Sequence, residues 1–124
     1  NFSAPSHVAI GDTVRAGPWR ARLEPLLRES PVADPMWYLD LLSARCEAVD
    51  LWQSEYYQVL RGDNPVKEWT KGTWLAPLLA ALPEHERDAF EQAYAERVAR
   101  AYPRRADGTT VLPFKRLFFV ARRA

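Results

Sequence analysis

The spacing of apolar and polar residues changes several times along the chain, and each change marks a predicted element. The strongest helical pattern covers residues 84–102, where Phe90, Tyr94, Val98 and Tyr102 recur every four residues among charged positions. Acidic residues lie near the start of this segment and arginines near its end, as the helix dipole favours. The pattern therefore predicts one long amphipathic helix.

Shorter helices are predicted where capping residues and prolines punctuate the chain. Ser3 can accept hydrogen bonds from the free N–H groups of a helix over residues 3–16, and Pro5 suits its first turn. Further helices are expected over residues 18–29, after an Asp34 N-cap, and from an Asn64 N-cap to the break at residues 71–72. Residues 74–82 predict a short apolar helix that Pro77 interrupts or kinks.

Two segments favour strands. Residues 46–60 alternate with period two and are rich in aromatic and β-branched side chains. Residues 111–123 predict a final strand whose apolar run, 117–121, indicates burial on both faces. Two strands are only marginally stable alone, so we expect the sheet to be larger than this chain can supply. The missing strands come either from a second copy or from the preceding part of a longer α/β protein.

Composition narrows the class of protein. The 124 residues suit one domain, and 17 Lys and Arg against 16 Asp and Glu give no cationic excess for a nucleic-acid partner. No apolar run approaches 18 residues, so no membrane span is expected. The single cysteine, Cys46, is read as a packing residue in a cytoplasmic protein, without a partner at metal-ligand spacing.

Several stretches taken together carry a family resemblance. They are NFSAPSHVAI, VDLWQSEYYQVL, NPVKEWTKGTWLAPLL and VLPFKRLFFVARR, with the long helix ending in AYP before the last of them. In this order they resemble the C-terminal half of the trans-aconitate 2-methyltransferases. The most specific motifs are the WxxGTxLxPxL pattern from Trp69 to Leu79 and the closing PFKRLFFVARR.

The resemblance implies the C-terminal part of a Rossmann-like methyltransferase sheet, two antiparallel strands with a mainly helical insertion. Residues 1–45 would then be helices that follow a missing fifth strand, residues 46–60 and 111–123 the two strands, and residues 61–110 a helical lid over the substrate. The final strand would lie inside the sheet, which agrees with its apolar pattern.

The glycines depart from what a complete methyltransferase needs. Glycines occur at positions 11, 17, 62, 72 and 108, and none form a GxGxxG-like cluster after a strand. The resemblance places the S-adenosylmethionine site in the missing N-terminal half. We therefore expect the 124-residue chain alone to be inactive and the full-length parent to methylate a small tricarboxylate.

A tricarboxylate needs several converging cations or hydroxyl donors, whereas methylation of a carboxylate needs no strong base. The substrate-binding candidates are His7, Tyr57, Trp69, Thr73 and Arg116. In the fold that the resemblance implies, the helix that carries His7 follows the missing fifth strand, at the carboxyl end of the sheet where ligands bind. The break at Gly72 and Thr73 is expected to expose N–H groups and a hydroxyl to an anion.

Each candidate also has a structural alternative. His7 can be a surface or capping residue, and Trp69 is bulky enough to be core. Tyr56 and Tyr57 face opposite sides of a strand, so only one of them is expected at a ligand. Lys115 and Arg116 lie in an apolar strand and bind either a carboxylate ligand or a Glu or Asp partner. Lys67 and Lys71 are read as solvated surface charges.

A second function class stays open at this point. A non-catalytic interaction domain would pair its exposed strand edges with a partner or with another copy of itself.

Overall fold

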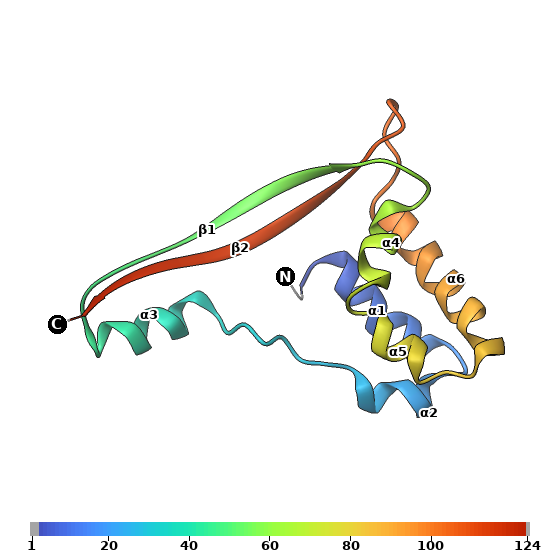
Figure 1. The fold of residues 1–124 in the computed structure, drawn as a ribbon, viewed down its shortest axis with the longest axis horizontal. Coiled ribbons are helices and arrows are strands. Elements are labelled where there is room, and N and C mark those ends of the chain that lie inside the picture. Colours follow the sequence, from blue (N-terminus) through green and yellow to red (C-terminus); the bar gives the residue numbers. More distant parts are fainter. Residues whose placement is uncertain (1–2, 124) are drawn as a thin grey trace.

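The computed structural model describes residues 3–123, in which a long two-stranded ribbon extends from a cluster of helices (Figure 1). The predicted α/β class is confirmed, since a mainly helical insertion separates two antiparallel strands. In chain order the elements are α1 (Pro5–Ala16), α2 (Arg20–Leu23), the 3₁₀ helix η1 (Glu24–Leu26), α3 (Pro35–Ser43), β1 (Cys46–Leu60), α4 (Pro65–Lys71), α5 (Ala76–Ala80), α6 (Glu84–Ala101) and β2 (Thr110–Arg123).

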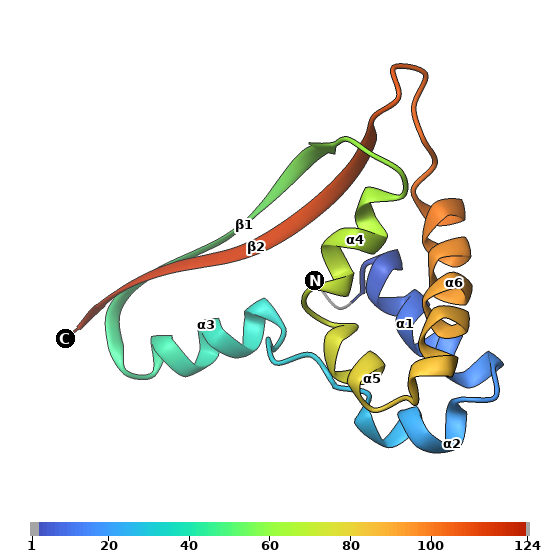
Figure 2. The ribbon, with the colours of Figure 1, turned by 45° about the vertical axis from the view of Figure 1, so that its right-hand side comes forward.

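The ribbon pairs β1 with β2 along almost their whole lengths. The register runs from Leu60 opposite Thr110 to Ala48 opposite Arg122, with an irregularity between Cys46 and Ala48. In this register Trp52 lies opposite Phe118, and their stacked rings have centroids 5.7 Å apart. The inserted helices lie at one end of the ribbon, and its other end carries the C-terminus (Figures 1 and 2).

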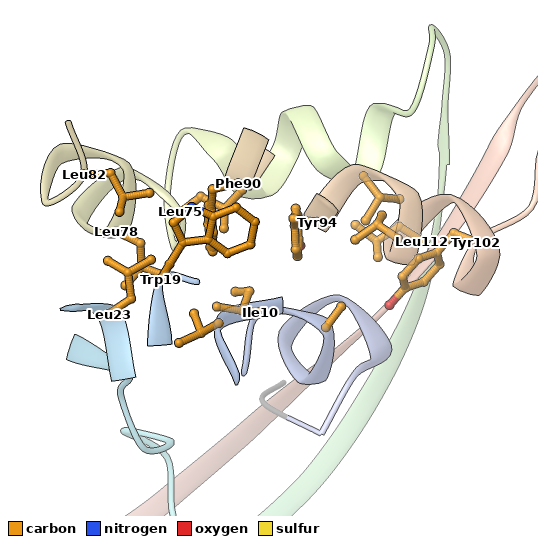
Figure 3. Packing of buried hydrophobic residues seen from close by; sticks show 14 residues of the cluster. Ile10, Trp19, Leu23, Leu75, Leu78, Leu82, Phe90, Tyr94, Tyr102 and Leu112 are labelled. Carbon is orange, nitrogen blue, oxygen red and sulfur yellow. The ribbon is translucent and has the colours of Figure 1, made fainter. Parts of the chain in front are cut away.

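The core lies among the helices and not along the ribbon. Helix α6 supplies the residues predicted from its pattern, and Phe90, Tyr94 and Val98 are fully buried. Figure 3 shows Phe90 and Tyr94 among the other core side chains. They pack against α1, α4 and α5, whose buried members include Val14, Val66 and Leu78. Full burial of side chains of this size contributes about 1.5–3 kcal/mol each. The helical cluster is therefore the stable body that positions any site.

Within this chain the final strand is not buried on both faces, so its expected burial inside a larger sheet stays a prediction. Phe119 is 49% exposed and Val120 is 61% exposed, while Trp52 and Tyr56 on β1 are also about half exposed. The reason is that no second layer covers the ribbon, apart from α3 near its far end (Figures 1 and 2). A strand with this apolar pattern therefore keeps large exposed patches, which usually mark an interaction surface.

Helix α3 contacts the ribbon far from the helical cluster. Tyr38 stacks on Phe119 with ring centroids 6.3 Å apart. The predicted cap is confirmed, because the Asp34 carboxylate accepts a hydrogen bond from the Met36 N–H at 2.9 Å. An extended segment after η1 crosses the gap between the two regions (Figure 2).

Several predicted helix ends are wrong. Ala4, not Ser3, is the N-cap of α1, and no side chain caps it. The helix predicted over residues 18–29 ends at Leu23 because Pro25 follows in η1. Pro77 does not kink a helix, since it occupies the first turn of α5.

Asn64 precedes α4 as predicted, but its side chain does not cap that helix. The residue has a left-handed φ of 48°, and its Nδ2 donates to the Ala95 carbonyl of α6 at 2.9 Å. The side chain therefore ties the start of α4 to α6. Among the helices of residues 3–123, none combines the length and the apolar character that crossing a membrane requires.

Candidate substrate cavity

Two tyrosines of α6 hold the start of α1 in place. The Tyr94 hydroxyl donates to the Ser6 carbonyl at 3.0 Å, and the Ser6 N–H donates to the Tyr102 hydroxyl at 3.1 Å. Burial raises the pKa of Tyr94 to about 12. Both backbone groups of Ser6 are thus anchored, and this fixes the position of the next residue, His7.

A cavity of about 500 Å³ lies between α1, the segment around η1, and α5. This volume is in the range of sites for small organic ligands. The apolar part of its wall comes from all three elements and consists of Val8, Ile10, Leu26, Leu27, Pro77 and Leu78. The hollow is open to solvent on one side, where Val8 is 50% exposed, so its apolar wall would strengthen charge interactions only once a cover excludes water.

His7 and Thr73, two of the predicted site residues, meet at this cavity. His7 is half-buried and its ring lies edge-on to Trp74, with centroids 5.3 Å apart. Burial lowers the pKa of His7 below the ordinary value of 6.5. The imidazole is therefore neutral at pH 7, where it can donate or accept a hydrogen bond.

Thr73 lies at the predicted break, yet the expected free backbone donor is absent. The Thr73 N–H donates to the Thr70 carbonyl at 3.1 Å, and the Thr73 hydroxyl donates to the same carbonyl at 3.2 Å. The Thr73 amide is thus already paired, and of the two Thr73 donors only the hydroxyl can rotate away from that carbonyl toward an anion.

Charged residues that sequence reasoning missed also line the cavity. They are Arg15 and Asp12 from α1 and Arg28 from the segment after η1. The Arg15 Nε lies 3.4 Å from the Glu24 carboxylate, which the Arg20 Nε approaches at 3.2 Å. With His7 neutral, the two arginines outweigh Asp12 in the lining that the structure describes.

Gly11 makes room for one of these cations. A Cβ atom at position 11 would lie 2.8 Å from the Arg15 Nη1 and 3.5 Å from its Cζ. Gly11 lies one helical turn before Arg15, and the Arg15 guanidinium lies directly over it. A glycine inside a helix otherwise costs about 1 kcal/mol relative to alanine, so its use here fits a need for space.

Tyr57 lies at a different place, in a second groove of about 540 Å³ between the ribbon and the end of α6. Lys115, Arg105 and Glu55 line the same groove. Tyr57 is 65% exposed, and none of the other four predicted site residues joins it there.

Trp69 and Arg116 line neither of these two hollows. Trp69 is 47% exposed, so the alternative that it packs in the core is wrong. The Arg116 guanidinium carbon lies 5.1 Å from the Phe114 ring centroid and 5.8 Å from that of Tyr56. Within residues 3–123, Arg116 makes a cation–π stack and no ion pair.

The two lysines beside the break are paired. Lys71 contacts Glu91 at 2.6 Å, and Lys67 contacts Glu68. They are therefore balanced by carboxylates and do not point to an anion site. Within the described part of the chain, no three His, Cys, Asp or Glu side chains gather as metal ligands would.

Comparison with known proteins confirms the resemblance found in the sequence. The chain is 42% identical over 121 residues to a trans-aconitate 2-methyltransferase of Azoarcus sp. (strain BH72) and 42% identical over 124 residues to that of Mycolicibacterium gilvum (strain PYR-GCK). It is 43% identical over 123 residues to that of Rhodococcus jostii (strain RHA1).

Each of these matches covers 98% of this chain but only 47–49% of the relative. The chain thus spans about half the length of the curated relatives that it matches. No family model matches the chain.

Proposed function

We propose that this chain is the substrate-lid and sheet-completing half of an S-adenosylmethionine-dependent methyltransferase. The whole enzyme would esterify trans-aconitate or a similar tricarboxylate in the cytoplasm. The observation that carries the proposal is identity of 42–43% across 98% of the chain to proteins named trans-aconitate 2-methyltransferase. The mixed apolar and cationic cavity supports the substrate part.

Methylation of a carboxylate needs no strong acid or base from the protein. A carboxylate is already ionised near pH 7, so its oxygen needs alignment with the methyl group and protection from water. The apolar wall would exclude water, and arginine and hydroxyl donors at the cavity would orient the acid. The paired Lys67 and Lys71 are not needed for this role.

The residues of this chain do not fit the cofactor. The glycines at positions 62 and 108 have positive φ in loops beside the strands, and no glycine cluster links a strand to a helix. We therefore assign S-adenosylmethionine to the part of the relatives that this chain does not span.

The half-exposed ribbon supports the sheet-completing role. Its faces carry Trp52, Tyr56, Phe119 and Val120, all about half exposed or more. Cover from the rest of a larger α/β protein would bury these side chains. The helices between β1 and β2 would then form the lid, with α1 closing the cavity beneath α5.

Cofactor binding tests whether S-adenosylmethionine binds to the N-terminal half and not to this chain. A chimera joins the N-terminal half of the Azoarcus relative to this chain, and calorimetry compares its S-adenosylmethionine binding with that of the 124-residue chain. We expect binding by the chimera and none by the chain. Tight binding by the chain alone would contradict the assignment of the cofactor to the other half.

Substrate kinetics of the chimera test the cavity. His7→Ala and Thr73→Ala are expected to lower kcat/KM for trans-aconitate about tenfold each, as loss of one hydrogen bond to a charged group does. His85→Ala is the matched control, because His85 is exposed on α6 and outside the cavity. Unchanged kcat/KM in both cavity variants would remove those residues from the site.

The exposed ribbon also favours the second function class. Uncovered strands and aromatic side chains would let two copies pair edge to edge. Light scattering separates the two: a folded chain that stays strictly monomeric at 14.2 kDa argues against pairing as its function.

A further inference from the structure

The cationic end of the cavity offers a more specific inference than the family resemblance does. We propose that Arg15 and Arg28 bind carboxylates of a small polycarboxylate in the cavity, and that Gly11 is required to seat Arg15. The inference rests on the proposed function for the identity of the acid. Its geometric basis is independent of that function.

The Arg15 guanidinium is oriented before any ligand binds. Its Nε faces the Glu24 carboxylate at 3.4 Å, while the Nη1 edge lies over Gly11 at the cavity wall. A guanidinium has five N–H donors in a fixed plane. One side can thus hold Glu24 while the remaining edge receives a carboxylate in two parallel hydrogen bonds.

Arg28 and Asp12 are the other charged residues of the described cavity lining around the Arg15 guanidinium. Arg28 is exposed and lines the same cavity from the segment after η1. Asp12 is the one acidic residue in the described lining, so the two guanidinium groups leave an excess of one positive charge. An acid with several carboxylates can contact both arginines and keep another carboxylate away from Asp12.

Gly11 gives this arrangement its sharpest test. An alanine Cβ would come within 2.8 Å of the Arg15 Nη1, which lies at the end of a flexible side chain. The guanidinium would move aside, while the helix itself would not suffer because alanine favours helices over glycine. Gly11→Ala should therefore damage ligand binding without damaging the fold.

The experiment measures binding of trans-aconitate to the 124-residue chain by calorimetry at low salt. Gly11→Ala and Arg15→Gln are each expected to weaken binding about tenfold, which is the effect of one charge-assisted contact. Arg20→Gln is the matched control, because Arg20 contacts the same Glu24 but does not line the cavity. It should change the affinity less than twofold, and circular dichroism should show the same helix content in all variants.

Two further ligands sharpen the result. The trimethyl ester of trans-aconitate keeps the carbon skeleton without the charges and should not bind. Inorganic phosphate should bind more weakly than trans-aconitate. No detectable binding of trans-aconitate, equal binding of phosphate, or affinity unchanged in Gly11→Ala and Arg15→Gln would each overturn the inference.

Failure of the proposed function would look different. Arginine-dependent binding to the chain without methyl transfer by the chimera would keep the site and reject the function. Methyl transfer with a KM for trans-aconitate that Gly11→Ala leaves unchanged would keep the function and reject the site.

Discussion

The two tyrosines that hold Ser6 allow a test of the rule that changing the more buried side chain destabilises a protein more. We predict the opposite order for this pair. Tyr94 is fully buried and Tyr102 is 9% exposed, so burial alone ranks Tyr94→Phe as the more damaging change (Figure 3). The hydrogen bonds predict the opposite order. Tyr94 donates to a helical carbonyl, whereas Tyr102 accepts from a first-turn N–H.

The magnitudes follow from what each removal leaves behind. Inside α1 the Ser6 carbonyl keeps its intrahelical bond, so Tyr94→Phe should cost about 0.5–1.5 kcal/mol. The Ser6 N–H belongs to the first turn, where no intrahelical acceptor exists, and Ser6 is buried. Tyr102→Phe leaves this donor without a partner, which costs about 1–3 kcal/mol.

Urea unfolding followed by circular dichroism measures both variants in the 124-residue chain. We expect a lower free energy of unfolding for Tyr102→Phe than for Tyr94→Phe, at unchanged m-value. Equal costs, or a larger cost for Tyr94→Phe, would refute the reasoning that the orphaned N–H decides the order.

The remaining predictions concern pH and packing. Because burial raises the pKa of Tyr94 to about 12 from 10.0, the folded chain holds its proton longer, so stability should fall between pH 10 and 12 by about 3 kcal/mol. Alkaline unfolding should lose this slope in Tyr94→Phe. Because burial lowers the pKa of His7, stability should fall as the pH drops below 6.5, and acid titration of His7→Gln should show a shallower fall. Phe90→Ala should cost about 3–5 kcal/mol, since Phe90 is fully buried, while Phe119→Ala on the half-exposed ribbon should cost much less in the same denaturation assay.

The sequence predicted the elements whose pattern is local. The four-residue repeat of α6 follows from burial of one helix face, and the alternation of β1 follows from the two-residue side-chain period of a strand. Both elements were predicted with nearly correct bounds. Helix ends were predicted less well. The prediction assumed side-chain caps or free N–H groups there, whereas backbone carbonyls of the turn can accept from these N–H groups. Thr70 accepts from the Thr73 N–H, and Ala4 caps α1 without a side chain.

The site was predicted only in part, because it depends on which segments meet in space. His7 and Thr73 were expected from helix starts and breaks, and they do line one cavity. Arg28 was missed because only the path of the chain through η1 brings it to the cavity that α1 lines. Arg15 was missed although it lies about two turns after His7 on the same helix. The apolar pattern of the ribbon predicted burial, but these residues alone cannot supply the layer that would cover it, so the ribbon is exposed.

Under the proposed function, this chain completes a carboxyl methyltransferase. Transfer of a labelled methyl group from S-adenosylmethionine to trans-aconitate, followed by mass spectrometry of the product, tests it most directly. We expect a labelled methyl ester from the chimera with the Azoarcus N-terminal half and none from either half alone. A folded chimera that binds S-adenosylmethionine but forms no ester of trans-aconitate would contradict it.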